Sequence, residues 1–198
     1  MLKRFYSLAL LQALCQHSAA FEILAIGSSN TNCKNVDRSQ IFTAHLESML
    51  KTDGINATVI NGGKDGDEPI WMIRRLTDSI KADTKIVILE PGPNDKSKSR
   101  SIEYSEKMLT MLKEKQIPTI YVSNNNVQSA EEAKEFVKGF GAYYYGNFAS
   151  NMPVTQEYRQ YDGGHGGGAG HLTAKGCEQW AKSIMPLVKK VIADRKVN

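Results

Sequence analysis

The stretch Ile23-Leu24-Ala25-Ile26-Gly27-Ser28-Ser29-Asn30-Thr31 begins as a continuous apolar run and ends in a glycine and four small polar residues. Such a run is typical of a strand buried on both faces of a parallel sheet. In an open α/β sheet, ligands bind beyond the carboxyl ends of the strands. Ser28 and Ser29 are therefore expected where substrates bind. On this stretch alone they could act as a nucleophile or cap the next helix.

Segments with strand and helix character alternate along the rest of the chain. Short apolar runs predict further strands at 57–60, 85–90, 117–123 and 141–146. Helical spacing of apolar residues predicts helices at 41–50, 70–80, 102–115 and 131–138, and a last helix from 172 to the end. Alternation of this kind builds βαβ units, so we expect an α/β fold. It would be a three-layer sandwich with a parallel sheet of about five strands and helices on both faces.

The first twenty residues have the features of a secretory signal peptide. Lys3-Arg4 precedes an apolar segment at 5–15, which is too short to span a bilayer, and Ser18-Ala19-Ala20 offers small residues for cleavage. We therefore expect a signal peptide at 1–20, a single domain at 21–198, and export to the periplasm or the medium. No other segment is long and apolar enough to predict a membrane span.

Composition is that of a globular protein, with 198 residues of which 41% are hydrophobic and 23% charged. Without Lys3 and Arg4, 23 basic residues remain against 21 acidic ones, which lowers the net charge from +4 to +2. No stripe of Lys and Arg with interleaved aromatic residues is present. We therefore expect no nucleic-acid partner. The oligomeric state is not predicted.

Small polar or glycine-rich turns follow three of the expected strands, at 27–31, 61–67 and 91–95. A glycine-rich loop with two histidines, at 163–171, precedes the last helix. Parallel strands bring such turns to one edge of the sheet. Acyl transfer requires a nucleophile, hydrogen-bond donors for an oxyanion, and a histidine base oriented by a carboxylate. The three turns and the histidine-bearing loop together contain residues of each of these types.

Four blocks in this sequence resemble those of the SGNH (GDSL-type) hydrolases. Residues 27–31 resemble the Gly-Asp-Ser block around the nucleophile, and 61–66 resemble the second block. Gly92-Pro93-Asn94-Asp95 matches Gly-x-Asn-Asp, and 171–176 match the closing histidine block. The blocks occur in family order over nearly all of 21–198. The resemblance implies a flavodoxin-like fold and a serine hydrolase of small-molecule carboxylic esters, with no metal or organic cofactor.

The resemblance also implies a role for individual residues. Ser29 would attack the ester carbonyl, and His171 would accept its proton and later protonate the leaving alcohol, with an upstream aspartate orienting the imidazole. The backbone N–H groups of Ser29 and Gly66 and the side-chain amide of Asn94 would stabilise the oxyanion.

Two positions depart from the family pattern. Ser28 stands where an aspartate is usual, and Gly168 stands three residues before His171, where the family places the orienting aspartate. Asp162 has that spacing relative to His165 instead. Either Asp162 serves His171 across a glycine-rich insertion, or His165 is the base. We favour Asp162 with His171, because His171 opens the last helix, whereas His165 lies among glycines.

The same resemblance leads to a prediction about Cys33 and Cys177. If Ser29 and His171 meet, the helices that follow them start side by side, and each cysteine lies about one turn into its helix. We therefore expect a Cys33–Cys177 disulfide, which an exported compartment permits.

Alternative functions remain open at this point. A thioesterase, a lysophospholipase or a carbohydrate O-deacetylase would use the same groups, and an inactive SGNH-like binding domain would keep only the fold. An unrelated flavodoxin-like module that binds phosphate in its glycine loops is a further alternative, although no Gly-x-x-x-x-Gly-Lys-Ser/Thr motif is present.

Overall fold

The computed structural model describes residues 20–161 and 170–197. Three of the expectations above therefore lie outside the described residues: the signal peptide up to residue 19, Asp162 as the orienting acid, and His165 as the alternative base.

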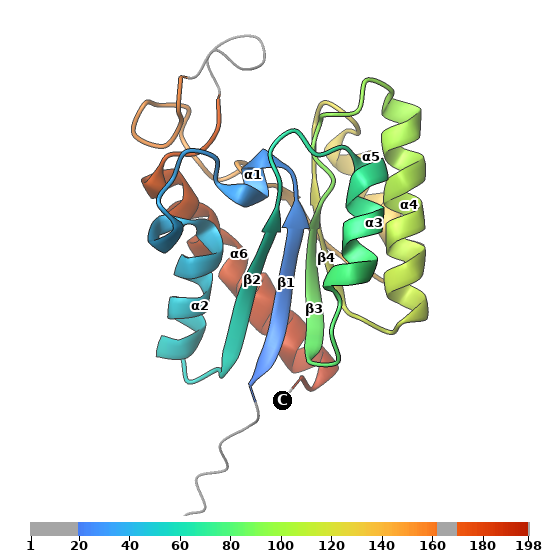
Figure 1. Ribbon diagram of the computed structural model, residues 1–198, viewed down its shortest axis with the longest axis horizontal. Helices are drawn as coiled ribbons and strands as arrows, with labels where there is room; N and C mark the ends of the chain where they lie inside the picture. Colours follow the sequence, from blue (N-terminus) through green and yellow to red (C-terminus); the bar gives the residue numbers. More distant parts are fainter. Residues whose placement is uncertain (1–19, 162–169, 198) are drawn as a thin grey trace, which may run out of the picture.

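Five strands form one sheet with the order β2-β1-β3-β4-β5, and every neighbouring pair is parallel (Figure 1). The strands are β1 (Phe21–Gly27), β2 (Ala57–Gly63), β3 (Thr84–Glu90), β4 (Thr119–Ser123) and β5 (Tyr143–Asn147). This confirms the predicted α/β sandwich. The strand order reverses between β1 and β3, and such a switch point is where a sheet of this kind opens a crevice for ligands.

Helices cover both faces of the sheet. They are α1 (Ser29–Asn32), α2 (Phe42–Thr52), α3 (Pro69–Ser79), α4 (Lys98–Glu114), α5 (Ala130–Lys138) and α6 (Ala174–Arg195), with a 3₁₀ turn, η1 (Arg38–Gln40). The helices α2 and α6 pack on one face, and α3, α4 and α5 pack on the other. No helix within 20–161 and 170–197 is long and apolar enough to cross a membrane.

The continuous apolar run of β1 serves both layers. Ile23 and Ala25 face the core under α2 and α6, whereas Leu24 and Ile26 face the core under α3 and α4. All seven residues of β1 are buried. This burial on both faces explains why the strand shows no polar–apolar alternation.

Two elements differ from the sequence prediction. The strand β2 runs on to Gly63, because residues 61–63 pair in register with 25–27 of β1 instead of forming a loop. The helix after Ser29 has only four residues and ends at Cys33, whose backbone is left-handed (φ 51°). Cys33 therefore lies at the end of α1, and only Cys177 lies one turn into a longer helix.

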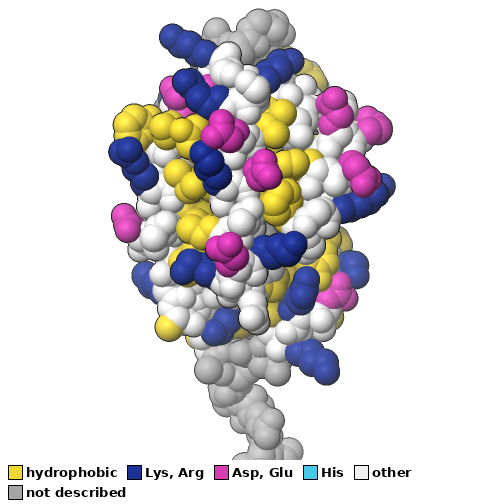
Figure 2. All heavy atoms as spheres, turned by 90° about the vertical axis from the view of Figure 1, so that its right-hand side faces the viewer, with side chains coloured by type: hydrophobic (Ala, Val, Ile, Leu, Met, Phe, Trp, Pro, Cys, Tyr) yellow, Lys and Arg dark blue, Asp and Glu magenta, His cyan; other side chains and the backbone are white. Residues whose placement is uncertain are grey.

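Charged side chains of both signs lie on one face of the molecule. Figure 2 shows Lys and Arg side chains interspersed with Asp and Glu on the face that carries α4.

At the outer edge of β2, the backbone N–H of Val59 donates to the Glu47 carboxylate of α2 at 2.7 Å.

Candidate active site

Ser29 and His171 meet at the carboxyl edge of the sheet. The Nε2 atom of His171 lies 2.8 Å from the Oγ atom of Ser29, although the two residues are 142 positions apart. Ser29 is the first residue of α1 and follows β1, while His171 lies just before α6. Both side chains are half-buried and line a cavity of about 270 Å³. The structure thus brings together the predicted nucleophile and the favoured base.

A short antiparallel pairing holds His171 in position. Arg159 and Leu172 form an isolated β-bridge, and the backbone N–H of Gln160 donates to the carbonyl of His171 at 2.7 Å. The Gln160 side chain continues the link, since its amide donates to the carbonyl oxygens of Leu172 and Lys34. Residues 158–160 therefore connect the segment before α6 to the segment after α1.

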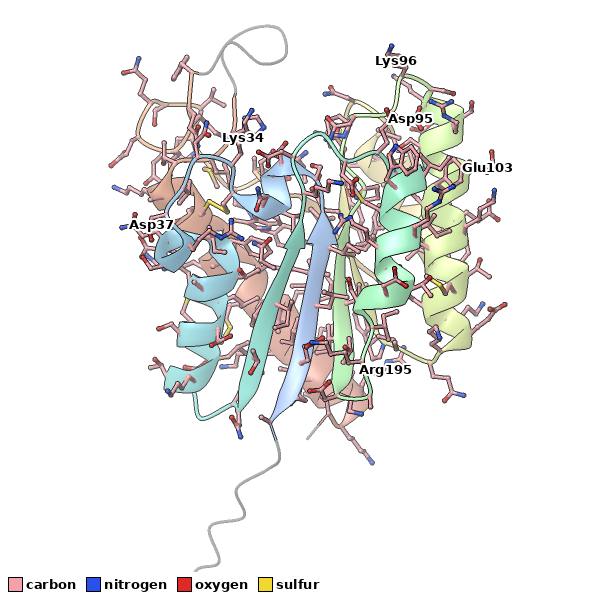
Figure 3. The ribbon with its side chains drawn as sticks, viewed as in Figure 1. Lys34, Asp37, Asp95, Lys96, Glu103 and Arg195 are labelled. Atoms are coloured by element: carbon pink, nitrogen blue, oxygen red, sulfur yellow. A yellow bond between two sulfur atoms is a disulfide. The ribbon has the colours of Figure 1, made fainter. Side chains whose placement is uncertain are left out.

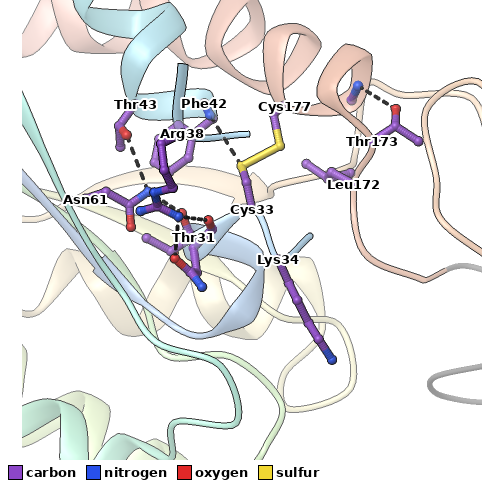
Figure 4. The surroundings of a disulfide bond; sticks show 12 residues. Thr31, Cys33, Lys34, Arg38, Phe42, Thr43, Asn61, Leu172, Thr173 and Cys177 are labelled. Atoms are coloured by element: carbon purple, nitrogen blue, oxygen red, sulfur yellow. Dashed lines mark hydrogen bonds between the residues drawn. A yellow bond between two sulfur atoms is a disulfide. The ribbon is translucent and has the colours of Figure 1, made fainter. Parts of the chain in front are cut away.

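A Cys33–Cys177 disulfide lies beside this connection and joins α1 to α6 (Figure 4), as predicted. The Cα atoms of the two cysteines are 6.6 Å apart. Both cysteines are fully buried, with exposed fractions of 1% and 0%. The end of α1 and the first turn of α6 are thus covalently linked close to Ser29 and His171. A disulfide is consistent with an oxidising compartment.

The turn that carries Ser29 is organised around a buried carboxylate that sequence reasoning assigned no role. Glu90, the last residue of β3, is 1% exposed. Its carboxylate accepts hydrogen bonds from the backbone N–H of Ser28 at 3.0 Å and from the Ser28 hydroxyl at 2.9 Å. The Thr31 hydroxyl and the Asn30 amide donate to it at 3.1 and 3.4 Å. Four donors from the turn therefore converge on one side chain.

This network gives a physical reason for serine at position 28. A serine hydroxyl donates to Glu90, whereas an aspartate there would place a second carboxylate against a buried one. Space is also limited, because a Cβ added at Gly92 would lie 2.7 Å from the Ser28 Oγ atom. Gly92 has a φ of 70°, which also disfavours any other residue.

Glu90 leads to a prediction on stability and pH. Burial raises the pKa of Glu90, and the hydrogen bonds from Ser28, Asn30 and Thr31 oppose this rise in part. A carboxyl whose pKa is higher in the folded than in the unfolded state stabilises the fold below the unfolded value, about 4.3 for glutamate. That contribution is lost as the pH rises through the folded pKa.

We therefore expect the free energy of unfolding of the wild type, relative to Glu90→Gln, to fall as the pH rises from about 4. Urea unfolding of both proteins over a pH series measures this difference. A difference that stays constant, or that grows with pH, would contradict a raised pKa at Glu90.

The second and third predicted blocks occupy neighbouring loops. The Asn94 side chain lines the cavity, and its amide nitrogen donates to the backbone carbonyl of Asp67 at 2.9 Å. That nitrogen carries two hydrogens, so one can still donate to a ligand. Gly66 lies in an exposed turn with a φ of 70°. The described residues that line the cavity do not include Gly66.

Two ion pairs brace these loops. Asp67 pairs with Arg75 of α3 at 2.5 Å, and Arg75 also donates to the carbonyl of Gly62 at 2.7 Å. Asp95 accepts hydrogen bonds from Arg100 of α4, at 2.8 Å for the shortest, and this contact holds the pKa of Asp95 below its usual range. Figure 3 shows Asp95 at the same edge of the sheet as the Ser29 turn. These acids therefore support the loops.

Several residues of the cavity carried no recognisable sequence signal. They lie just after β4, at the end of β5, and in the segment between β5 and α6: Asn124, Asn125, Asn126, Asn147, Phe148 and Arg159. No group of three or more His, Cys, Asp or Glu side chains that could hold a metal ion occurs among the described residues.

Comparisons with known proteins find similar proteins by structure and none by sequence. No protein-family model and no curated protein matches the sequence. Among solved structures, the chain is similar to TesA, with a TM-score of 0.75 and 17% identity over 86% of this chain and 99% of that one. It is also similar to AlinE4, described as an SGNH-hydrolase family esterase, with a TM-score of 0.65 and 24% identity over 88% and 97% of the two chains.

A third similar structure is the psychrotrophic esterase EstA from Pseudoalteromonas sp., inhibited by monoethylphosphonate. Its TM-score is 0.75 and its identity 13%, over 87% of this chain and 98% of that one. These three proteins are matched over 97% to 99% of their own lengths, so the similarity extends over the whole domain. The chain has the fold of the SGNH hydrolases.

Proposed function

We propose that this protein is a serine hydrolase of carboxylic esters that works through an acyl-enzyme. The observation that carries the proposal is the 2.8 Å hydrogen bond between Ser29 Oγ and His171 Nε2 beside a cavity at the switch point of the sheet. A hydroxyl at hydrogen-bonding distance from an imidazole, next to space for a substrate, is the arrangement of an activated nucleophile. The esterases of similar fold support the same reaction class.

In the acylation step, Ser29 Oγ forms a bond to the carbonyl carbon of the ester while its proton moves to His171 Nε2. The carbonyl oxygen takes up the electron pair and becomes an oxyanion. When the tetrahedral intermediate collapses, the carbon–oxygen bond to the alcohol breaks, and His171 returns the proton to that alcohol. A water molecule then repeats the sequence on the acyl-enzyme and releases the acid.

The oxyanion requires hydrogen-bond donors that are already in position. As the first residue of α1, Ser29 has a backbone N–H that makes no intrahelical bond, and Asn94 has a second amide hydrogen beside the cavity. We propose these two groups as donors, each contributing about 3 to 4 kcal/mol of transition-state stabilisation. Gly66 stays a predicted third donor, and Asp162 the predicted partner of His171.

Labelling with a fluorophosphonate, followed by peptide mass spectrometry, tests the proposal. A phosphonate adduct on Ser29 is expected, because only an activated hydroxyl reacts with this electrophile. Hydrolysis of 4-nitrophenyl acetate, measured on the same sample, is expected alongside it. Folded protein that forms no adduct and hydrolyses no ester would overturn the proposal and favour a binding domain with the same fold.

The identity of the base gives a further prediction. His171→Ala is expected to lower the rate of fluorophosphonate labelling by at least about 10³-fold, since Ser29 then has no base at hydrogen-bonding distance. His165→Ala is the matched control and should label at close to the wild-type rate. The reverse result would assign the base to His165. Asp162→Ala, tested in the same way, is expected to slow labelling less than His171→Ala does.

We further propose that the protein is exported, with residues 1–20 removed as a signal peptide and 21–198 forming the exported domain. The Cys33–Cys177 disulfide supports an oxidising destination. N-terminal sequencing of the exported protein should find Phe21 as its first residue.

A further inference from the structure

The cavity beside Ser29 and His171 has an unusual chemical character for a site that binds an ester. Its lining contains six asparagine residues: Asn30, Asn94, Asn124, Asn125, Asn126 and Asn147. Ligand pockets are in general lined mainly by hydrophobic and aromatic groups. A volume of about 270 Å³ is also small. The cavity therefore suits a compact, polar substrate better than a long acyl chain.

Among the described residues, a buried cation also belongs to this lining. Arg159 is only 7% exposed, yet it contributes to the cavity. Within 20–161 and 170–197, no carboxylate forms an ion pair with its guanidinium, and its Nε atom is buried without a hydrogen-bond partner. The guanidinium instead lies over the ring of Phe148, with 5.6 Å between its central carbon and the ring centroid.

Such an arrangement is costly unless something else compensates the charge. Burial lowers the pKa of Arg159, but a guanidinium remains protonated at any physiological pH. Buried charges in proteins are normally paired, and an unpaired one is strongly destabilising. The guanidinium is also planar and suited to binding a carboxylate through two hydrogen bonds. Within the described residues, Arg159 is a cation in a polar cavity without a carboxylate partner, and such a group is a ready site for an anion.

The backbone fixes this cation relative to the reacting groups. Arg159 is bridged to Leu172, the residue directly after His171, and its own N–H donates to the carbonyl of Thr155 at 2.9 Å. An anion bound to Arg159 would therefore be held at a set distance from the Ser29–His171 pair.

We propose that Arg159 binds a carboxylate of the substrate, so that the protein prefers esters of short acyl groups in molecules that also carry a carboxylate. This inference rests on the proposed ester hydrolysis and names its substrate class. The carboxylate could belong to the alcohol part or to the acyl part of the ester, and both place the same chemistry against Arg159.

Two pairs of substrates separate these sources. For the alcohol part, 4-acetoxybenzoate is compared with the neutral 4-acetoxybenzamide. For the acyl part, the 4-nitrophenyl monoester of glutaric acid is compared with 4-nitrophenyl pentanoate. We expect at least a tenfold higher kcat/KM for the anionic member of one pair, mainly through a lower KM, because the interaction is made in the ground state as well as in the transition state.

Three variants assign the preference to Arg159. In Arg159→Gln, the ratio of kcat/KM for the anionic ester to kcat/KM for its neutral counterpart should fall to about one, whatever the absolute rates of the variant. Arg159→Lys should keep part of it, because a lysine ammonium lacks the planar fork. Lys96→Gln is the matched control, since it removes an exposed cation from the same edge of the sheet (Figure 3) and should leave the preference unchanged.

Thermal unfolding checks that each variant folds. If Arg159→Gln does not fold, the test rests on Arg159→Lys, in which the preference for the anionic ester should be partly lost. A wild type that hydrolyses the neutral esters without preferring either anionic one would overturn the inference and leave the proposed function intact. So would a preference that survives in folded Arg159→Gln.

A binding measurement separates failure of the inference from failure of the proposed function. Calorimetric titration with 4-hydroxybenzoate requires no turnover and should show binding to the wild type that is lost in Arg159→Gln. If no ester is hydrolysed but this difference is found, the anion site stands and the esterase proposal fails. If neither binding nor a preference is observed, the anion site is wrong.

Discussion

Ser29→Ala is expected to lower kcat for 4-nitrophenyl acetate by about 10⁴- to 10⁶-fold, because removal of a serine nucleophile leaves only binding and oxyanion stabilisation. KM should change little, since the hydroxyl makes no bond to the carbonyl carbon in the ground state. The midpoint of thermal unfolding should be close to that of the wild type. The Ser29 side chain is small and half-buried, and the substitution removes its hydrogen bond to His171.

Ser28→Ala is the matched control for this prediction, because it deletes a hydroxyl one residue away. Ser28 is fully buried and donates to Glu90, so it does not line the cavity as Ser29 does. Its loss should lower kcat by about tenfold at most, as the backbone N–H of Ser28 still donates to the carboxylate. If Ser28→Ala abolished turnover and Ser29→Ala did not, the nucleophile would have been assigned to the wrong serine.

Removal of the disulfide is expected to have the largest effect on stability. The Cys33–Cys177 bond closes a loop with a sequence separation of 144 residues. Constraining the unfolded chain over a loop of this size is worth about 3 to 5 kcal/mol. The variant Cys33→Ala/Cys177→Ala should lose free energy of unfolding of about this amount, measured as a lower urea midpoint.

A reducing agent gives the same test without a substitution. It should lower the urea midpoint of the wild type and leave that of the double variant unchanged. Alkylation with and without reduction should reveal two additional thiols after reduction. Equal midpoints for the wild type and the double variant would show that the bond contributes nothing to stability.

The elements that could be predicted were those with a local signal. The apolar runs of β1 and β3 and the turns at 27–31 and 91–95 identify buried strands with polar carboxyl ends, which is enough to expect Ser29 and Asn94 at one edge. The pairing of Cys33 with Cys177 followed once Ser29 and His171 were taken to meet.

The residues that sequence reasoning missed depend on tertiary contacts. The sequence indicates only that Glu90 ends a strand. The folded chain shows that four hydrogen-bond donors of the Ser29 turn converge on its carboxylate. Arg159 lies in a stretch without periodicity or motif, so its burial beside the cavity could not be predicted. The strand β2 extends to Gly63 because β1 pairs with it there, although Asn61-Gly62-Gly63 is typical of a turn.

The contact between Glu47 and Val59 has a consequence for association between molecules. An edge strand offers unpaired backbone groups to which another chain can add a strand, and this is a common start of aggregation. In β2, the carboxylate of Glu47 already occupies the N–H of Val59. An incoming strand would have to displace this hydrogen bond and approach a negative charge. This contact therefore opposes the addition of a further strand at the β2 edge of the sheet.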